Sequence, residues 1–158
     1  MKKQGFTLIE LMVVIVIMGI LAAVAVPKLF GMIAKSKASE VGPAAGTYVK
    51  LADAYIAEIG DTLSSFSDIG YEISDTQSFS YTDKWAEKKV LETGAAWEAE
   101  SKVALNNCAK GNKWTLNANK SSTGNGAAWT VSALDSECKA LTPQFENLAK
   151  GTVASSGD

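Results

Sequence analysis

The chain has 158 residues with 15 lysines and no arginine, against 17 aspartates and glutamates, which gives a formal net charge of -2. The lysines form no cluster that would follow a phosphate backbone, so no nucleic-acid partner is expected. Histidine, the commonest general base and metal ligand at neutral pH, is absent, and cysteine occurs only twice, so we expect neither an enzyme nor a bound cofactor or metal.

The N-terminal segment is a long apolar run. Phe6 to Val26 is apolar apart from Thr7, Glu10 and Gly19. As a helix these residues are about 31 Å long, which matches the hydrocarbon thickness of a bilayer. Lys2 and Lys3 precede the run, and the positive-inside tendency therefore predicts a cytoplasmic N-terminus with the rest of the chain outside.

Three placements of this run are possible. A cleavable secretory signal fits the lysines and the small residues 22–25, but the run is longer than the usual 7–15 residues and contains a carboxylate. An ordinary single-pass anchor leaves Glu10 at a cost of up to about 2.5–3.5 kcal/mol at the bilayer centre. In the third placement, a cut between Gly5 and Phe6 creates an ammonium group that Glu10 of a neighbouring helix can pair with, and this pairing sets the stagger of a helix bundle.

The run from Lys3 to Leu11 reads Lys-Gln-Gly-Phe-Thr-Leu-Ile-Glu-Leu, and an unbroken apolar stretch continues from it to Pro27. This segment resembles the class III signal of type IV pilins and pseudopilins. The resemblance implies that a prepilin peptidase cuts after Gly5 and methylates the amine of Phe6. It also implies that Glu10 meets that amine on an adjacent subunit, and we place Thr7 in the same assembly site.

The first helix contains residues that weaken it. Gly19 lowers helix stability by about 1 kcal/mol relative to alanine, and Pro27 removes an internal hydrogen bond. The resemblance implies that residues 19–27 can unwind when a subunit passes from the bilayer into a fibre; alternatively, Gly19 allows close helix packing. Pro43, which follows Gly42, predicts a second bend.

The remaining chain predicts an α+β fold, in which the second half of a long helix packs on a small antiparallel sheet. An amphipathic stripe continues the helix through residues 35–59 to a stop at Gly60, and residues 60–94 are expected as a long loop with a short strand or helix. Candidate strands at Ala96–Leu105, Lys113–Asn117 and Ala128–Leu134 predict a meander. A final helical turn is expected at residues 143–149, followed by a loose end.

The expected organisation is a leader at residues 1–5, a membrane and filament-core helix at 6–34, and a globular domain at 35–158. Within that domain the helix covers 35–59, the loop 60–94, the meander with both cysteines 95–142, and the tail 143–158.

The two cysteines, Cys108 and Cys138, have no zinc-site spacing. In an exported chain they favour a disulfide that closes a loop of about 31 residues and stabilises the fold by roughly 3–4 kcal/mol; a pair of buried free thiols is the alternative. They resemble the C-terminal disulfide region of many type IV pilins. Asp135 and Glu137 resemble the calcium loop of major pseudopilins, although a solvated acidic surface explains them as well.

These features together predict a major type IV pilin: a precursor in the bacterial inner membrane, then a homopolymer forming an extracellular pilus for adhesion, motility or surface attachment. The expected partners are further copies of the chain, the prepilin peptidase and the pilus assembly machinery. The alternatives are a pseudopilin of a type II secretion system and an exported ligand-binding domain with a conventional signal peptide.

Overall fold

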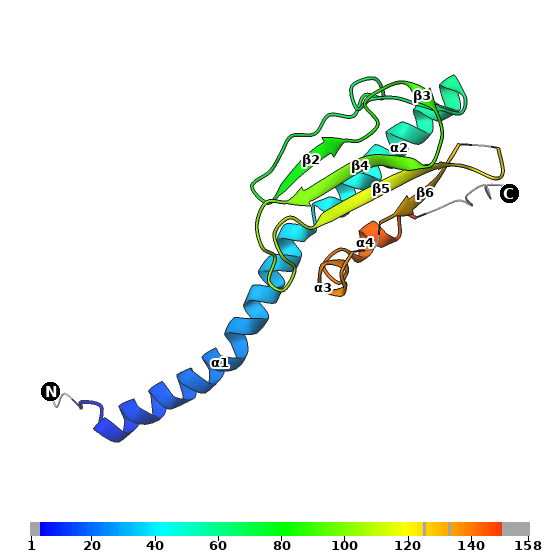
Figure 1. Ribbon diagram of the computed structural model, residues 1–158. Helices are drawn as coiled ribbons and strands as arrows, with labels where there is room; N and C mark the ends of the chain where they lie inside the picture. The colour runs from blue at the N-terminus through cyan, green and yellow to red at the C-terminus, as the bar shows by residue number, and fades with distance from the viewer. Residues whose placement is uncertain (1–3, 125, 133, 150–158) are drawn as a thin grey trace.

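Two consecutive helices form the long axis of the molecule. The computed structural model describes residues 4–124, 126–132 and 134–149, so Lys2, Lys3 and the end of the predicted tail, 150–158, lie outside the described residues. Helix α1 spans Leu8–Ala38 and helix α2 spans Val41–Ile59. Figure 1 shows α1 projecting away from the other elements, whereas α2 lies beside the sheet.

A four-stranded antiparallel sheet covers one side of α2. Its strands are β2 (Phe79–Asp83), β4 (Gly94–Ser101), β5 (Lys113–Lys120) and β6 (Ala127–Val131), in the order β2-β4-β5-β6. The three strands predicted from the sequence are β4, β5 and β6, and the predicted meander is confirmed. The α+β class, with a long helix backed by a small sheet, is also confirmed.

The stretch 60–94, expected mainly as a loop, contains three strands. Besides β2, it holds the two-residue strands β1 (Thr62–Leu63) and β3 (Lys89–Val90), which pair with each other. Strand β2 alternates apolar and polar side chains over only five residues, and it is stabilised by pairing with β4, where Tyr81 lies opposite Ala99. Such a short alternation is a weak signal without its partner strand.

Three tryptophans on the inner face of the sheet connect it to the helices. The strand registers place Trp97, Trp114 and Trp129 on this face, and all three are buried. The Trp129 indole N–H donates to Asp53 on α2 over 2.7 Å, and the Trp97 N–H donates to the hydroxyl of Tyr71 over 3.1 Å. Because every one of these indoles has a hydrogen-bond acceptor, the large rings are buried without an unpaired donor.

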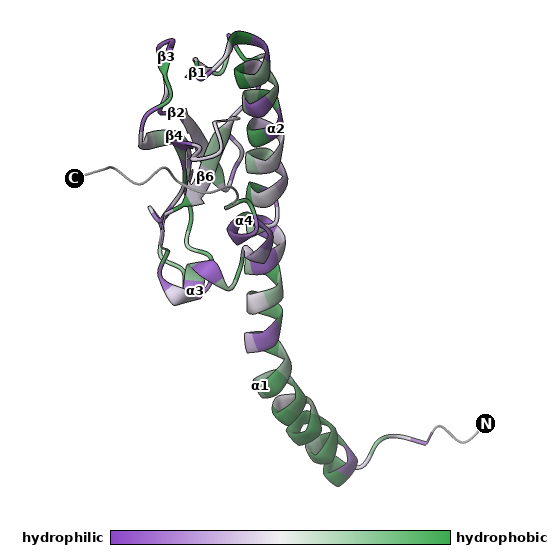
Figure 2. Cartoon of the chain, turned by 90° about the vertical axis from the view of Figure 1, so that its right-hand side faces the viewer, coloured by the Kyte–Doolittle hydropathy of each residue, from purple (hydrophilic) through white to green (hydrophobic). Residues whose placement is uncertain are grey.

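The amphipathic stripe of α2 supplies the other side of the core. Its fully buried members are Val41, Ala45, Tyr48, Val49, Ala52 and Ile56. Ala44, Leu51 and Tyr55 are half-buried, and Ile59 at the helix end is exposed, so the stripe fades where the sheet no longer covers it. Figure 2 shows α2 running beside the sheet, with its upper end next to β1.

The interruption of the long helix lies just ahead of Pro43. Helix α1 passes through Pro27 without a break and ends at a turn formed by Ser39 and Glu40. Pro43 then lies in the first turn of α2, where a missing backbone N–H removes no helical hydrogen bond. Figures 1 and 2 show that α1 also changes direction part-way along its length.

Two short helices follow the sheet. Helix α3 spans Ser136–Lys139, and helix α4 spans Pro143–Glu146 within the stretch expected to form a final helical turn. A disulfide joins Cys108, in the loop after β4, to Cys138 in α3, with the Cα atoms 4.8 Å apart. The bridge predicted from the sequence is therefore present, and both cysteines are completely buried.

Candidate processing and assembly site

The expected cleavage position lies in an exposed, non-helical segment. Residues 4–7 precede α1 without regular structure, and the side chain of Phe6 is 83% exposed. Thr7 has an extended backbone (φ -76°, ψ 155°) and caps the helix, which begins at Leu8. The Gly5–Phe6 peptide bond is thus outside the helix and open to solvent.

Thr7 and Glu10 form a reciprocal cap at the start of α1. The Glu10 Oε2 atom accepts the Thr7 backbone N–H and the Thr7 hydroxyl, each over 2.8 Å, while the Glu10 N–H donates to Thr7 Oγ1 over 3.2 Å. This capping box satisfies backbone donors that would otherwise be unpaired, and it puts a negative charge at the positive end of the helix dipole. The sequence pattern around Glu10 thus has a local structural role as well as its proposed role between subunits.

The first half of α1 packs against no other element of the described chain. The large apolar side chains from Phe6 to Ile33 are all more than 40% exposed, and the first buried residue of the helix is Ala34. By length and composition the helix is suited to cross a membrane. Figure 2 shows mostly apolar colouring along the part of α1 that projects from the domain. A helix that is apolar all round requires lipid or other helices around it.

The two residues expected to soften the helix both lie within this uncovered part. Pro27 is inside α1, and the position of a Cβ atom on Gly19 has no neighbour within 4 Å. No steric contact with the described residues therefore requires a glycine at position 19. Its effect on helix flexibility is intrinsic to the backbone, whereas a role in close helix packing would involve other molecules.

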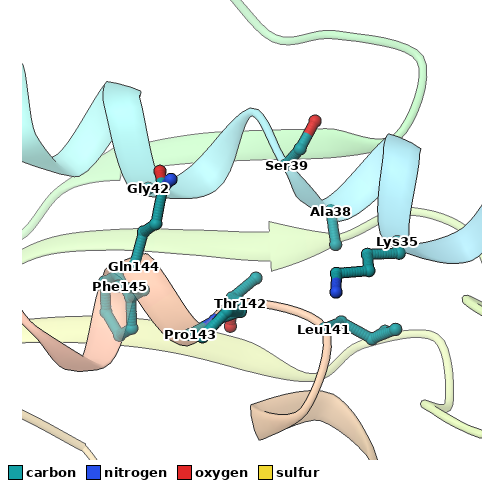
Figure 3. Close-up of a pocket in the computed structure, with 9 residues that line it drawn as sticks. All are labelled: Lys35, Ala38, Ser39, Gly42, Leu141, Thr142, Pro143, Gln144 and Phe145. Carbon is teal, nitrogen blue, oxygen red and sulfur yellow. The ribbon is translucent and has the colours of Figure 1, made fainter.

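Two grooves flank α1 where it enters the globular domain. The first, of about 130 Å³, runs between one helical face (Lys35, Ala38, Ser39, Gly42) and residues 141–145. Figure 3 shows Lys35 extending across this groove toward Leu141. The second, of about 150 Å³, lies between Phe30, Ile33, Ala34 and Lys37 and the loop residues 104–106. The end of the domain thus holds the helix from two sides.

Asp135 and Glu137, which the sequence suggested as calcium ligands, each accept hydrogen bonds within the chain. The Asp135 carboxylate caps α3 by accepting the backbone N–H groups of Glu137 and Cys138, and the Glu137 carboxylate accepts the Asn107 amide over 3.3 Å. Among the residues that the structure describes, no three acidic, cysteine or histidine side chains gather as metal ligands do. Asp135 therefore positions the helix that carries the second cysteine.

Glu40, in the turn between α1 and α2, has a structural role that the sequence did not predict. The Glu40 carboxylate accepts the hydroxyl groups of Thr76 over 2.6 Å and of Tyr81 over 3.0 Å, and so connects the α1–α2 turn to β2. Burial, followed by this hydrogen bond, raises the pKa of Tyr81. Because both partners are more than 35 residues away along the chain, no local pattern could have indicated them.

Comparison with known proteins finds similarity in the N-terminal segment of the chain, which contains the expected cleavage position. Residues 1–26 match the family model of the prokaryotic N-terminal methylation motif. The chain is 56% identical over 39 residues to the type IV major pilin protein PilA of Myxococcus xanthus. It is 52% identical over 52 residues to a type IV major fimbrial protein FimA of Dichelobacter nodosus. The N-terminal segment of the chain thus carries the methylation motif and is similar to the same segment of type IV pilins.

These similarities cover a limited part of each protein. The match to the Myxococcus pilin covers 25% of this chain and 18% of that protein. The match to the Dichelobacter protein covers 32% of each. A second Dichelobacter FimA matches at 56% identity over 25% of each chain. The globular domain of this chain is thus described by its own structure rather than by these relatives.

Proposed function

We propose that this chain is a type IV pilin, that is, a structural subunit of a type IV pilus. In this proposal α1 holds the precursor in the inner membrane and then packs with α1 of other copies in the core of a helical filament at the cell surface. The filament serves adhesion, motility or surface attachment. The observation that carries the proposal is the apolar surface of α1 between Phe6 and Ile33, which the globular domain leaves uncovered.

The proposed processing step is cleavage between Gly5 and Phe6 by a prepilin peptidase, followed by methylation of the new amine. The exposed extended backbone of residues 4–7 supports this step, because a peptidase must reach a peptide bond that is not already hydrogen-bonded in a helix. The cap at Thr7 keeps the helix from extending back over the scissile bond. The similarity to the methylation motif supports the same cut.

Glu10 and Thr7 then act in assembly. Before polymerisation, Glu10 lies in a segment proposed to be in lipid, where an unpartnered carboxylate is costly. The two hydrogen bonds from Thr7 reduce that cost, and both use Oε2, which leaves Oε1 for another donor. In the bundle, the Phe6 ammonium of an adjacent copy supplies that donor. Helix registers that bring Glu10 next to the Phe6 ammonium of an adjacent copy are favoured over registers that leave either charge unpaired.

The stretch from Gly19 to Pro27 supplies flexibility during this transfer. It contains two of the poorest helix formers within a segment that makes no contact with the globular domain. Local unwinding there would let a subunit change its length without disturbing the sheet. Polymerisation exchanges lipid for protein around the helix, so packing and charge pairing stabilise the bundle more than new burial from water does.

Mass spectrometry of the mature chain tests the processing step. We expect a chain that begins at Phe6 and carries one added methyl group, recovered from surface filaments. A chain that begins near Val26 would instead indicate a conventional signal peptide, and the proposal would be wrong.

The role of Glu10 is tested in cells that make filaments with the unchanged chain. We expect Glu10→Ala to reduce the filament yield at least tenfold while the variant still accumulates in the membrane. Lys50→Ala, on an exposed position of α2, is the control and should leave the yield unchanged. An undiminished yield for Glu10→Ala would refute charge pairing without refuting the pilus subunit itself.

A further inference from the structure

The exposed lysines of this chain are unevenly placed. One group lies where α1 meets the globular domain, and we call it the basic patch: Lys28, Lys35, Lys37, Lys102 and Lys110. The first three lie on α1, and the other two lie in the loop between β4 and β5. That loop contacts α1, because its residues 104–106 share a groove with Ile33 and Lys37. Two segments far apart in sequence thus meet where α1 enters the domain, with Lys35 and Lys37 in the two grooves on either side of the helix.

The basic patch contains no acidic side chain. Neither of its stretches, 28–37 and 102–110, includes an aspartate or glutamate, whereas residues 38–149 outside the patch carry 15 acidic residues and seven lysines. Five of those seven, at positions 84, 89, 113, 120 and 139, lie within 4 Å of a carboxylate. In the described part of the chain no lysine of the patch has such a partner. The Lys102 ammonium donates instead to the Thr76 carbonyl over 2.9 Å. The remaining concentration of positive charge favours an anionic partner from outside the chain.

The position of the patch along α1 identifies that partner. The exposed apolar surface ends at Ile33, and the domain begins to cover the helix at Ala34. If α1 spans a bilayer, the patch lies at the level of the outer headgroups, and Lys28 can extend its ammonium group up to the same level. Basic side chains next to a membrane helix are attracted to anionic lipids within about one Debye length.

We propose that the basic patch binds the anionic phospholipid headgroups of the outer leaflet, and so fixes the depth and the tilt of the subunit before assembly. The inference rests on the proposed membrane placement of α1. The helix dipole explains Lys35 and Lys37 in the last turn of α1, but it explains neither Lys28 nor the two loop lysines. Entry into the filament then requires that the headgroup contacts be broken.

Lysine labelling of the full-length chain tests the proposal. The chain is reconstituted in vesicles of phosphatidylcholine alone and in vesicles with phosphatidylglycerol added, and is then treated with a membrane-impermeant amine-acylating reagent. Mass spectrometry reads each lysine, and Lys50, exposed on α2, is the internal control. We expect labelling of Lys35, Lys37 and Lys110 to fall at least threefold relative to Lys50 in the anionic vesicles, and 0.5 M salt to reverse most of this protection.

Two outcomes would overturn the proposal. Equal labelling in both kinds of vesicle would show that the headgroup charge has no effect. Protection that appears in phosphatidylcholine alone and increases with protein density would assign the patch to a second copy of the chain instead. Extraction of the vesicles with alkaline carbonate shows whether α1 is inserted in the membrane at all, and so separates a wrong basic patch from a wrong proposed function. A chain released by carbonate is not held by α1, whereas an inserted chain with freely reactive lysines refutes the patch alone.

Charge variants supply a second measurement. With spin-labelled phosphatidylglycerol as the probe, we expect Lys35→Gln/Lys37→Gln/Lys110→Gln to lower the preference for this lipid over phosphatidylcholine at least twofold. The upper limit is about fivefold for each lysine at the surface. The corresponding Lys→Arg variant, and Lys50→Gln/Lys88→Gln elsewhere on the domain, should keep the preference. An equal loss in the Lys50/Lys88 variant would mean that net charge, rather than the patch, attracts the lipid.

Discussion

Removal of the disulfide between Cys108 and Cys138 should lower the stability of the globular domain by about 3–4 kcal/mol. The two cysteines are 30 residues apart in sequence, and chain-entropy arguments give this value for a loop of that length. A double Cys→Ala substitution avoids placing a polar atom in these completely buried positions, although it adds a small packing loss. The expected total loss is therefore at the upper end of this range.

The measurement is urea unfolding of the full-length chain in detergent, followed by tryptophan fluorescence. All four tryptophans are buried in the globular domain, so their emission reports its unfolding rather than that of α1. Double replacement of Ala54 and Ala57, exposed on α2, by serine is a matched control away from the bridge. A midpoint that moves no more for the cysteine variant than for this control would show that the unfolded chain already keeps the two segments together, and the entropic reasoning would be refuted.

Two further predictions concern groups at the helix–sheet boundary. Burial raises the pKa of Tyr71 to about 12 and raises the pKa values of Tyr48 and Tyr81 as well. The unfolded chain therefore loses these protons first, near pH 10, so the contribution of these tyrosines to the free energy of unfolding should be constant below about pH 10. It should then fall by about 1.4 kcal/mol per pH unit for each tyrosine as the pH rises toward the folded values, which pH-dependent urea titrations would measure. A constant stability through pH 11 would contradict this account. Glu40→Ala removes the acceptor of two hydroxyl groups, those of Thr76 and Tyr81, and should cost about 2 kcal/mol in the same assay. If Tyr81→Phe on the Glu40→Ala background costs as much as it does alone, the hydrogen bond between Tyr81 and Glu40 contributes nothing.

The sequence alone determined the features that depend on neighbouring residues. The uninterrupted apolar run defines α1, and the position of Glu10 one turn after Phe6 identifies the proposed processing and assembly site. The three- and four-residue spacing around Tyr48 predicts the buried face of α2. Short alternating segments with turn residues between them predict β4, β5 and β6. In each case the signal lies within a few residues, because helix periodicity, strand alternation and membrane insertion are local properties.

Only the tertiary structure decided the features that join distant segments. Strand β2 depends on pairing with β4, and the acceptor role of Glu40 depends on Tyr81 and Thr76, which reach it only after the chain has folded back. The basic patch likewise combines lysines of α1 with a loop more than 60 residues later. Such contacts leave no periodic trace in the sequence, since their energy comes from groups that are neighbours in space and not along the chain.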